Sequence, residues 1–119
     1  MDKYITISRR SFVIVEPDPV IGLDLTGILQ SEFPEAELKL FRRQEDAEQH
    51  IHKVTSPICV VLSASVATAP MLALLQERVA SQGEVLFIGS ERDVGFPAAF
   101  VQTPFTSEMI LSGLIRQVG

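Results

Sequence analysis

The chain lacks several features that would place it in a specialised class of protein. It has one cysteine and no tryptophan among its 119 residues. A single cysteine cannot form an internal disulfide, so we expect a reducing, cytoplasmic setting. No apolar run approaches the roughly 18 residues that a membrane span requires. The apolar stretch after Arg9 and Arg10 ends at Glu16, which is too early for a secretory signal peptide.

Positive charge is also scarce. The ten Lys and Arg residues are outnumbered by fifteen Asp and Glu residues, which gives a net charge of -5. Nonspecific binding to a phosphate backbone needs an excess of cations, so we expect no nucleic-acid partner. No glycine-rich phosphate loop, nucleophile–base pair or metal-ligand cluster can be assembled from the sequence, which argues against an enzyme. The hydrophobic content of 46% fits one globular domain over residues 1–119.

Short apolar runs alternate with segments of helical spacing. Strands are predicted where the runs are continuous or alternate with period two: residues 12–15, 37–41, 58–62, 85–88 and 99–102. Helices are predicted where apolar residues recur every three or four positions: residues 19–33, 44–54, 70–82 and 107–118. Asp18 and Thr106 are expected to cap the first and last of these helices, and Gly83 is expected to end the third.

This alternation predicts an α/β fold. Strand–helix–strand connections favour a parallel sheet covered on both faces, which makes a three-layer αβα sandwich with strand order 2-1-3-4-5. Residues 89–98 connect the fourth and fifth strands and contain Gly95 and Pro97. That connection is too short for a good helix, so we expect the fourth helix to be short or missing. The functional crevice is expected at the carboxyl ends of the strands.

Two of these strand ends resemble those of the response-regulator receiver domain, a CheY-like family. Residues 13–25 pass from an apolar strand through Glu16, Pro17 and Asp18 into a helix, as the receiver's opening does. Residues 100–105 read Phe-Val-Gln-Thr-Pro-Phe, which is similar to the family's strand ending in Lys-Pro-Phe. The short fourth connection resembles a receiver subgroup associated with one class of sensor histidine kinases. The resemblance implies bacterial two-component or phosphorelay signalling, with a histidine kinase or another signalling protein as partner.

The residues of the implied phosphorylation pocket depart from the family pattern. A receiver uses a strand-three aspartate as nucleophile, two acidic residues that hold Mg²⁺, a hydroxyl residue after strand four and a lysine after strand five. The corresponding positions here are Glu16, Pro17, Asp18, Ser63, Gly89, Thr103 and Pro104. Serine replaces the nucleophile, proline the second acid, glycine the hydroxyl residue and threonine the lysine. Asp18 is one residue late, and its simpler role is the helix cap.

These departures predict a pseudo-receiver that acts by protein contact without aspartyl phosphorylation. We expect no catalytic residue, no cofactor and no metal, because the Mg²⁺ site is lost. Two alternatives stay open: an active phosphorelay receiver in which Glu16 or Asp18 accepts the phosphoryl group, and a small-ligand-binding domain of flavodoxin-like fold. The sequence also leaves open whether the pocket simply decayed or the domain is locked in one conformation.

The last predicted helix has a wider apolar surface than one packed face needs. Its apolar residues are Met109, Ile110, Leu111, Leu114, Ile115 and Val118. A surface for a protein partner or for a homodimer is one interpretation. The other is that the helix packs on the sheet and on a neighbouring helix.

Overall fold

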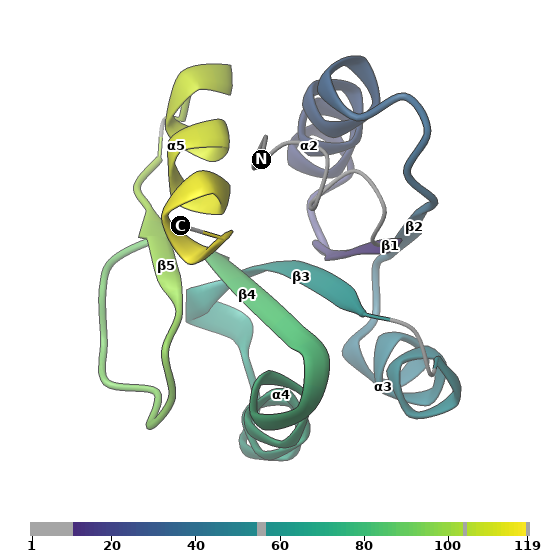
Figure 1. Ribbon diagram of the computed structural model, residues 1–119, viewed down its shortest axis with the longest axis vertical. Coiled ribbons are helices and arrows are strands. Elements are labelled where there is room, and N and C mark those ends of the chain that lie inside the picture. The colour runs from purple at the N-terminus through teal and green to yellow at the C-terminus, as the bar shows by residue number, and fades with distance from the viewer. Residues whose placement is uncertain (1–10, 55–56, 104, 119) are drawn as a thin grey trace.

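The fold is an open five-stranded parallel sheet between two layers of helices (Figure 1). The computed structural model describes residues 11–54, 57–103 and 105–118, at backbone level only for 81–82 and 115–118. The strands are β1 (Ser11–Val15), β2 (Leu38–Phe41), β3 (Ile58–Ser63), β4 (Gly83–Ile88) and β5 (Ala99–Val101). Their order is β2-β1-β3-β4-β5, and every pairing is parallel, as predicted.

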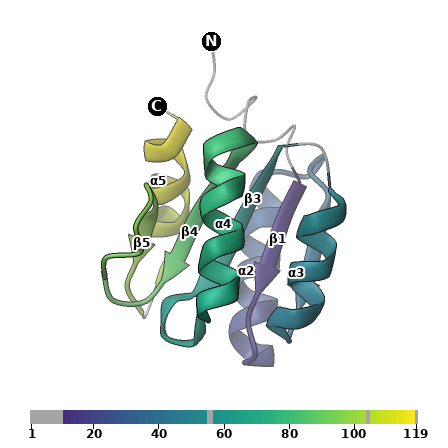
Figure 2. The same cartoon turned by 90° about the horizontal axis from the view of Figure 1, so that it is seen from below.

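The helices agree with the sequence prediction to within one or two residues. They are α2 (Pro19–Glu32), α3 (Gln44–Lys53), α4 (Ala69–Gln82) and α5 (Ser107–Val118), with a short 3₁₀ turn at Ala64–Val66. Helices α2 and α5 lie on one face of the sheet, and α3 and α4 lie on the other (Figures 1 and 2). The predicted three-layer sandwich is therefore confirmed.

Each face of the sheet has its own apolar core. Odd-numbered residues of β1 and β4, such as Val13 and Phe87, pack under α3 and α4. Even-numbered residues, such as Ile14 and Leu86, pack under α2 and α5. Because side chains alternate along a strand, a strand buried on both faces must be apolar at every position. This requirement explains the continuous apolar runs in the sequence.

The helix ends show why the chain turns where it does. The Asp18 carboxylate accepts hydrogen bonds from the backbone N–H groups of Val20 and Ile21, at 2.9 and 3.4 Å. The Thr106 hydroxyl accepts one from the Met109 N–H at 3.2 Å. Gly83 follows α4 directly and already has an extended backbone, with φ of -149°. A Cβ there would lie 2.9 Å from the Arg78 carbonyl oxygen, so close approach is what requires glycine.

The connection between β4 and β5 forms no helix anywhere in residues 89–98, all of which the structure describes. Gly95 has a φ of +84°, and its N–H donates to the Asp93 carboxylate at 3.0 Å, which makes a tight turn. The predicted loss of the fourth helix is confirmed. Among the described helices, none is both long enough and apolar enough to cross a membrane.

Candidate functional site

The sheet register brings four of the predicted pocket segments to one edge. Val15 of β1 is paired with Leu62 of β3, so the next residues, Glu16 and Ser63, lie side by side at the ends of these strands. Ser63 is paired with Ile88 of β4, and Gly89 follows. The Gly89 N–H donates to the carbonyl of Val101 at 2.8 Å, which joins β4 to the end of β5. The carboxyl ends of these strands therefore meet at one edge of the sheet, as the strand order predicts.

Glu16 is the buried charged residue of this edge, with 5% of its surface exposed. Its Oε2 accepts a hydrogen bond from the Asp18 N–H at 3.0 Å, which folds the β1–α2 turn back on itself. The Asp18 side chain is exposed and is used as the helix cap. Pro17 between them is exposed and carries no side-chain donor or acceptor. One inward carboxylate, rather than a cluster, thus remains from the acidic segment.

Ser63 ends β3, at the position where the resemblance places the phosphoacceptor aspartate of a receiver. Its hydroxyl oxygen lies 3.2 Å from that of Ser65, and the two hydroxyls share a hydrogen bond. Within the described part of the chain, no hydrogen bond joins the side chains of Glu16, Ser63 and Thr103, and no group of three or more His, Cys, Asp or Glu residues could hold a metal ion. Thr103 is exposed, and Pro104 lies outside the described residues.

Arg92 approaches this edge from the β4–β5 connection, and no pattern in the sequence predicts this approach. Its guanidinium donates a hydrogen bond to the carbonyl oxygen of Ala64 at 3.0 Å, one residue after Ser63. The bond spans 28 residues of sequence. A lone arginine in a loop gives no periodic signal, so only the three-dimensional structure reveals this contact. This hydrogen bond connects the β4–β5 connection to the residue that follows β3.

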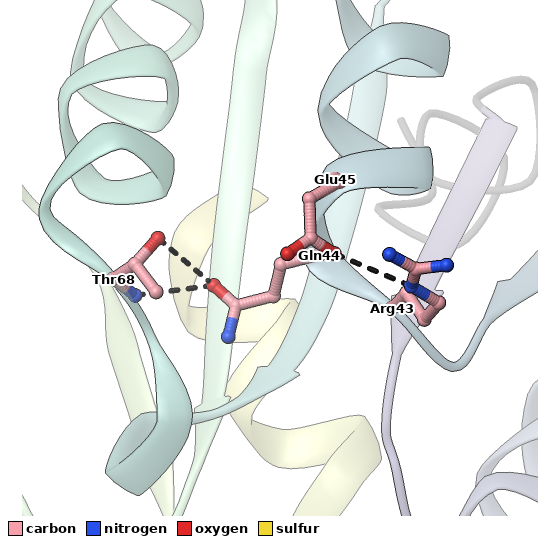
Figure 3. A network of polar contacts seen from close by, with 4 residues as sticks. All are labelled: Arg43, Gln44, Glu45 and Thr68. Carbon is pink, nitrogen blue, oxygen red and sulfur yellow. Dashed lines mark hydrogen bonds and ion pairs between the residues drawn. The ribbon is translucent and has the colours of Figure 1, made fainter.

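Gln44 of α3 forms hydrogen bonds to the far end of the segment that follows Ser63, residues 64–68 (Figure 3). Its Nε2 donates to the Val66 carbonyl, and its Oε1 accepts from the N–H and the hydroxyl of Thr68, at 3.1 and 3.3 Å. The Thr68 hydroxyl in turn accepts from the Met71 N–H at 3.4 Å and caps α4. Residues 64–68, which we call the β3–α4 loop, are thus tied to α3 by Gln44 and to the β4–β5 connection by Arg92.

The neighbouring pair Arg43 and Glu45 contributes much less. The two side chains lie 3.6 Å apart but are 72% and 69% exposed (Figure 3). Solvent screens such a pair, and exposed ion pairs add little to stability. Arg43 is therefore a suitable control position for Gln44.

Gly89, which by the resemblance replaces the hydroxyl residue of a receiver, has a backbone φ of +133°. Residues with a side chain rarely adopt this conformation. A Cβ built there would lie 3.4 Å from the Cβ of Ala64, which is an ordinary contact. The cost of a side chain at this position is therefore in the backbone rather than in lack of space.

The wide apolar surface predicted for α5 needs correction. Ile110 and Leu114 are fully buried in the core shared with Leu86 and Val101, so neither is available to a partner. They face the sheet because residues four apart share one side of a helix. Met109 and Leu111 are half-buried against the same core. The side chains of Ile115 and Val118 lie outside the described residues.

Comparison with known proteins gives one kind of match. No family profile matches the chain, and no curated protein matches its sequence. Solved structures do match. A receiver-domain protein from Bacillus halodurans has a TM-score of 0.70 at 18% identity, over 93% of this chain and 97% of that one. The chain has the fold of a response-regulator receiver domain.

Other matches agree on this receiver fold. A CheY-like receiver domain from Methanospirillum hungatei has a TM-score of 0.69 at 13% identity, covering 92% of this chain and 94% of that one. The chemotaxis protein CheY4 of Vibrio cholerae has a TM-score of 0.67 at 18% identity, covering 91% and 98% respectively. At these identities the likeness concerns the fold, and the pocket must be judged from its own residues.

Proposed function

We propose that this chain is a signalling module of receiver fold that acts by binding other proteins and does not undergo aspartyl phosphorylation. The observation that carries the proposal is which residues lie at the carboxyl ends of the strands. Ser63 stands at the end of β3, and Glu16 is the carboxylate buried beside it. A serine hydroxyl cannot form the acyl phosphate that an aspartate forms. On this proposal the protein is a cytoplasmic member of a two-component pathway and has no enzymatic activity of its own.

The donor set also fits Mg²⁺ poorly. Mg²⁺ prefers octahedral oxygen coordination that includes one or two carboxylates. Glu16 offers one carboxylate, already hydrogen-bonded to a backbone N–H, and the Asp18 carboxylate is used at the start of α2. Ser63 and Ser65 at the end of β3 offer neutral hydroxyl oxygens, and among the described residues no group of three or more His, Cys, Asp or Glu could hold a metal ion. We therefore propose that the module works without a metal ion.

The two ties on the β3–α4 loop support a fixed conformation over simple decay of the site. Arg92 and Gln44 hold the loop from opposite sides through bonds to Ala64, Val66 and Thr68. A conformational switch requires an element with two arrangements of similar free energy. Extra hydrogen bonds in one arrangement increase the free-energy difference between the two. We propose that partners recognise a single, constitutive state.

Acetyl phosphate with Mg²⁺, followed by intact-mass measurement, tests the proposal. We expect no stable gain of one phosphoryl group in the wild-type chain. A gain that persists would overturn the proposal, and its loss in Glu16→Gln or in Asp18→Asn would identify the acceptor. Ser63→Asp is the matched variant that restores a carboxylate at the end of β3. We expect Ser63→Asp to remain unmodified as well, because the second acidic residue and the lysine are still missing.

A further inference from the structure

β2 is an edge strand with an open outer side. It comes first in the strand order, so its one neighbour in the sheet is β1 (Figure 1). The carbonyls of Glu37 and Phe41 accept hydrogen bonds from N–H groups in and just after β1, at 2.8 and 3.0 Å. Successive residues of a strand direct their backbone groups to opposite sides, so those of Leu38, Leu40 and Arg42 point away from the sheet. Among the residues that the structure describes, no backbone hydrogen bond outside the helices and the sheet involves these three. Such an edge is a template for another strand.

The surface beside this edge is apolar. Three of the four large apolar side chains that are exposed in the described part of the chain belong to α2 and β2, namely Val20, Leu23 and Leu40. Leu40 lies on the α2 side of the sheet, because a Cβ at Gly22 would be 3.3 Å from its Cδ1. Leu40 is 40% exposed, and Leu23, the residue after Gly22, is 69% exposed. Burial of these side chains would add hydrophobic free energy to the backbone bonds of a paired strand.

The segment around β2 is complementary to itself in an antiparallel register centred on Leu40. In this register Leu40 exchanges hydrogen bonds with its counterpart in a second copy, and Leu38 pairs with Arg42. The acidic residue at one end, Glu37, then lies opposite the basic residue at the other end, Arg43. Opposite charges across a strand pair stabilise the pairing. The Arg43 side chain is 72% exposed, so it can turn toward a second copy.

The neighbouring registers are less favourable. Centring the pair on Lys39 would place two lysines directly opposite each other, which destabilises a strand pair. Centring it on Leu38 would require extended backbone before Glu37. That backbone instead makes a turn, in which the Ala36 N–H donates to the Phe33 carbonyl at 3.0 Å. The register at Leu40 is therefore the one that both charge and backbone allow.

The charge of this edge also permits contact with a second copy. The whole chain carries a net charge of -5, which would oppose self-association through an acidic surface. Residues 35–46 are nearly neutral, because their acidic and basic side chains almost balance: Glu35, Glu37, Glu45 and Asp46 against Lys39, Arg42 and Arg43. The edge of β2 is thus a surface where two copies meet without strong repulsion.

We propose that β2 pairs with β2 of a second copy about a two-fold axis at Leu40, which joins two sheets into one. A two-fold contact uses the same surface on both chains, and the complementarity of Glu37 and Arg43 is of this kind. Lys39 is the type of residue that guards an edge strand, but here it lies opposite Phe41 of the second copy. The pairing uses no side chain at the carboxyl ends of the strands, so it goes beyond the proposed function and does not depend on the missing phosphorylation.

Sedimentation velocity from about 10 µM to 1 mM measures the self-association. The paired surface is short, so we expect a dissociation constant on the order of 100 µM, and unfolding at a few micromolar reports on the single chain. Glu37→Arg and Arg43→Glu should each weaken the dimer roughly tenfold, because symmetry repeats the charge pair. The double variant Glu37→Arg/Arg43→Glu should return to within about threefold of the wild type, since it restores opposite charges. Leu40→Lys should abolish the dimer by placing two like charges at the axis.

Glu91→Arg is the matched control, because it makes the same charge change at an exposed residue of the β4–β5 connection, far from β2. It should dimerise like the wild type, and a well-dispersed amide spectrum of each variant verifies folding. In the ¹⁵N-labelled wild-type chain, shifts that depend on protein concentration should centre on Leu38, Leu40 and Arg42. A chain that stays monomeric at 1 mM, shifts centred on β5 or α5, or a double variant no better than the single variants would overturn the inference.

Discussion

Replacing Gln44 by alanine should loosen the β3–α4 loop. The change removes the bond to the Val66 carbonyl and the two bonds from Thr68. A neutral hydrogen bond contributes a net of about 0.5 to 1.5 kcal/mol. These three bonds are exposed and share one side chain, so together they contribute less than three independent buried bonds would. We therefore expect the free energy of unfolding to fall by about 1 to 2 kcal/mol. Urea unfolding measures the change, and hydrogen exchange at the Thr68 amide localises it.

Arg43→Ala is the control, because it removes a neighbouring side chain whose ion pair is exposed. It should change the free energy of unfolding by less than about 0.5 kcal/mol. Gln44→Glu is an informative second variant, since it keeps the acceptor for Thr68 but loses the donor to Val66. If Gln44→Ala cost no more than Arg43→Ala, or if exchange at the Thr68 amide were unchanged, the loop would not be held as described.

Substitutions at four further positions test the local structure by urea unfolding. Asp18→Ala should cost about 1 kcal/mol through loss of the helix cap, whereas Asp18→Asn should be nearly neutral; equal losses would contradict a capping role. Gly27→Ala should stabilise by about 0.5 to 1 kcal/mol, because a Cβ there meets nothing within 4 Å. Gly113→Ala should instead destabilise by about 1 kcal/mol, since its Cβ would lie 2.8 Å from Leu86 Cδ1; the same sign for both would refute the packing argument. Gly89→Ser should cost about 1 to 3 kcal/mol because of its positive φ, and a neutral result would contradict that backbone conformation.

Much of the fold could be predicted because its causes are local. The run Phe12–Val15 is apolar at every position, so it has to be a strand covered on both faces. Asp18 followed by proline marks a helix start by its own hydrogen-bonding chemistry. Gly95 and Pro97 exclude a helix in the segment before β5. Each of these signals lies within a few residues of the feature that it determines.

The candidate site was predictable in position but not in its contacts. Parallel strand order places Glu16, Ser63 and Gly89 at one edge, and the sequence pattern was sufficient for that. The bonds from Arg92 and Gln44 join segments that are 22 to 28 residues apart. They depend on the direction of a single side chain, which leaves no periodic trace in the sequence.

The last helix illustrates the same limit. Its apolar residues cover more than one side, and periodicity could not decide which of them face the sheet. Gly113 determines which side of α5 faces the sheet. Because it has no side chain, the helix can approach Leu86 and Val101 closely, and Ile110 and Leu114 are buried beside it. The close approach becomes visible only when the distance between helix and sheet is known.

We propose that the sheet edge formed by Glu16, Ser63 and Gly89 lacks the groups needed to hold a phosphoryl group with its metal ion. The most direct measurement is a titration of the ¹⁵N-labelled chain with beryllium fluoride, a phosphoryl analogue, in the presence of Mg²⁺. We predict that the amides of Glu16, Ser63 and Gly89 keep their chemical shifts throughout the titration. Saturable shifts at these amides that require both reagents would contradict the account.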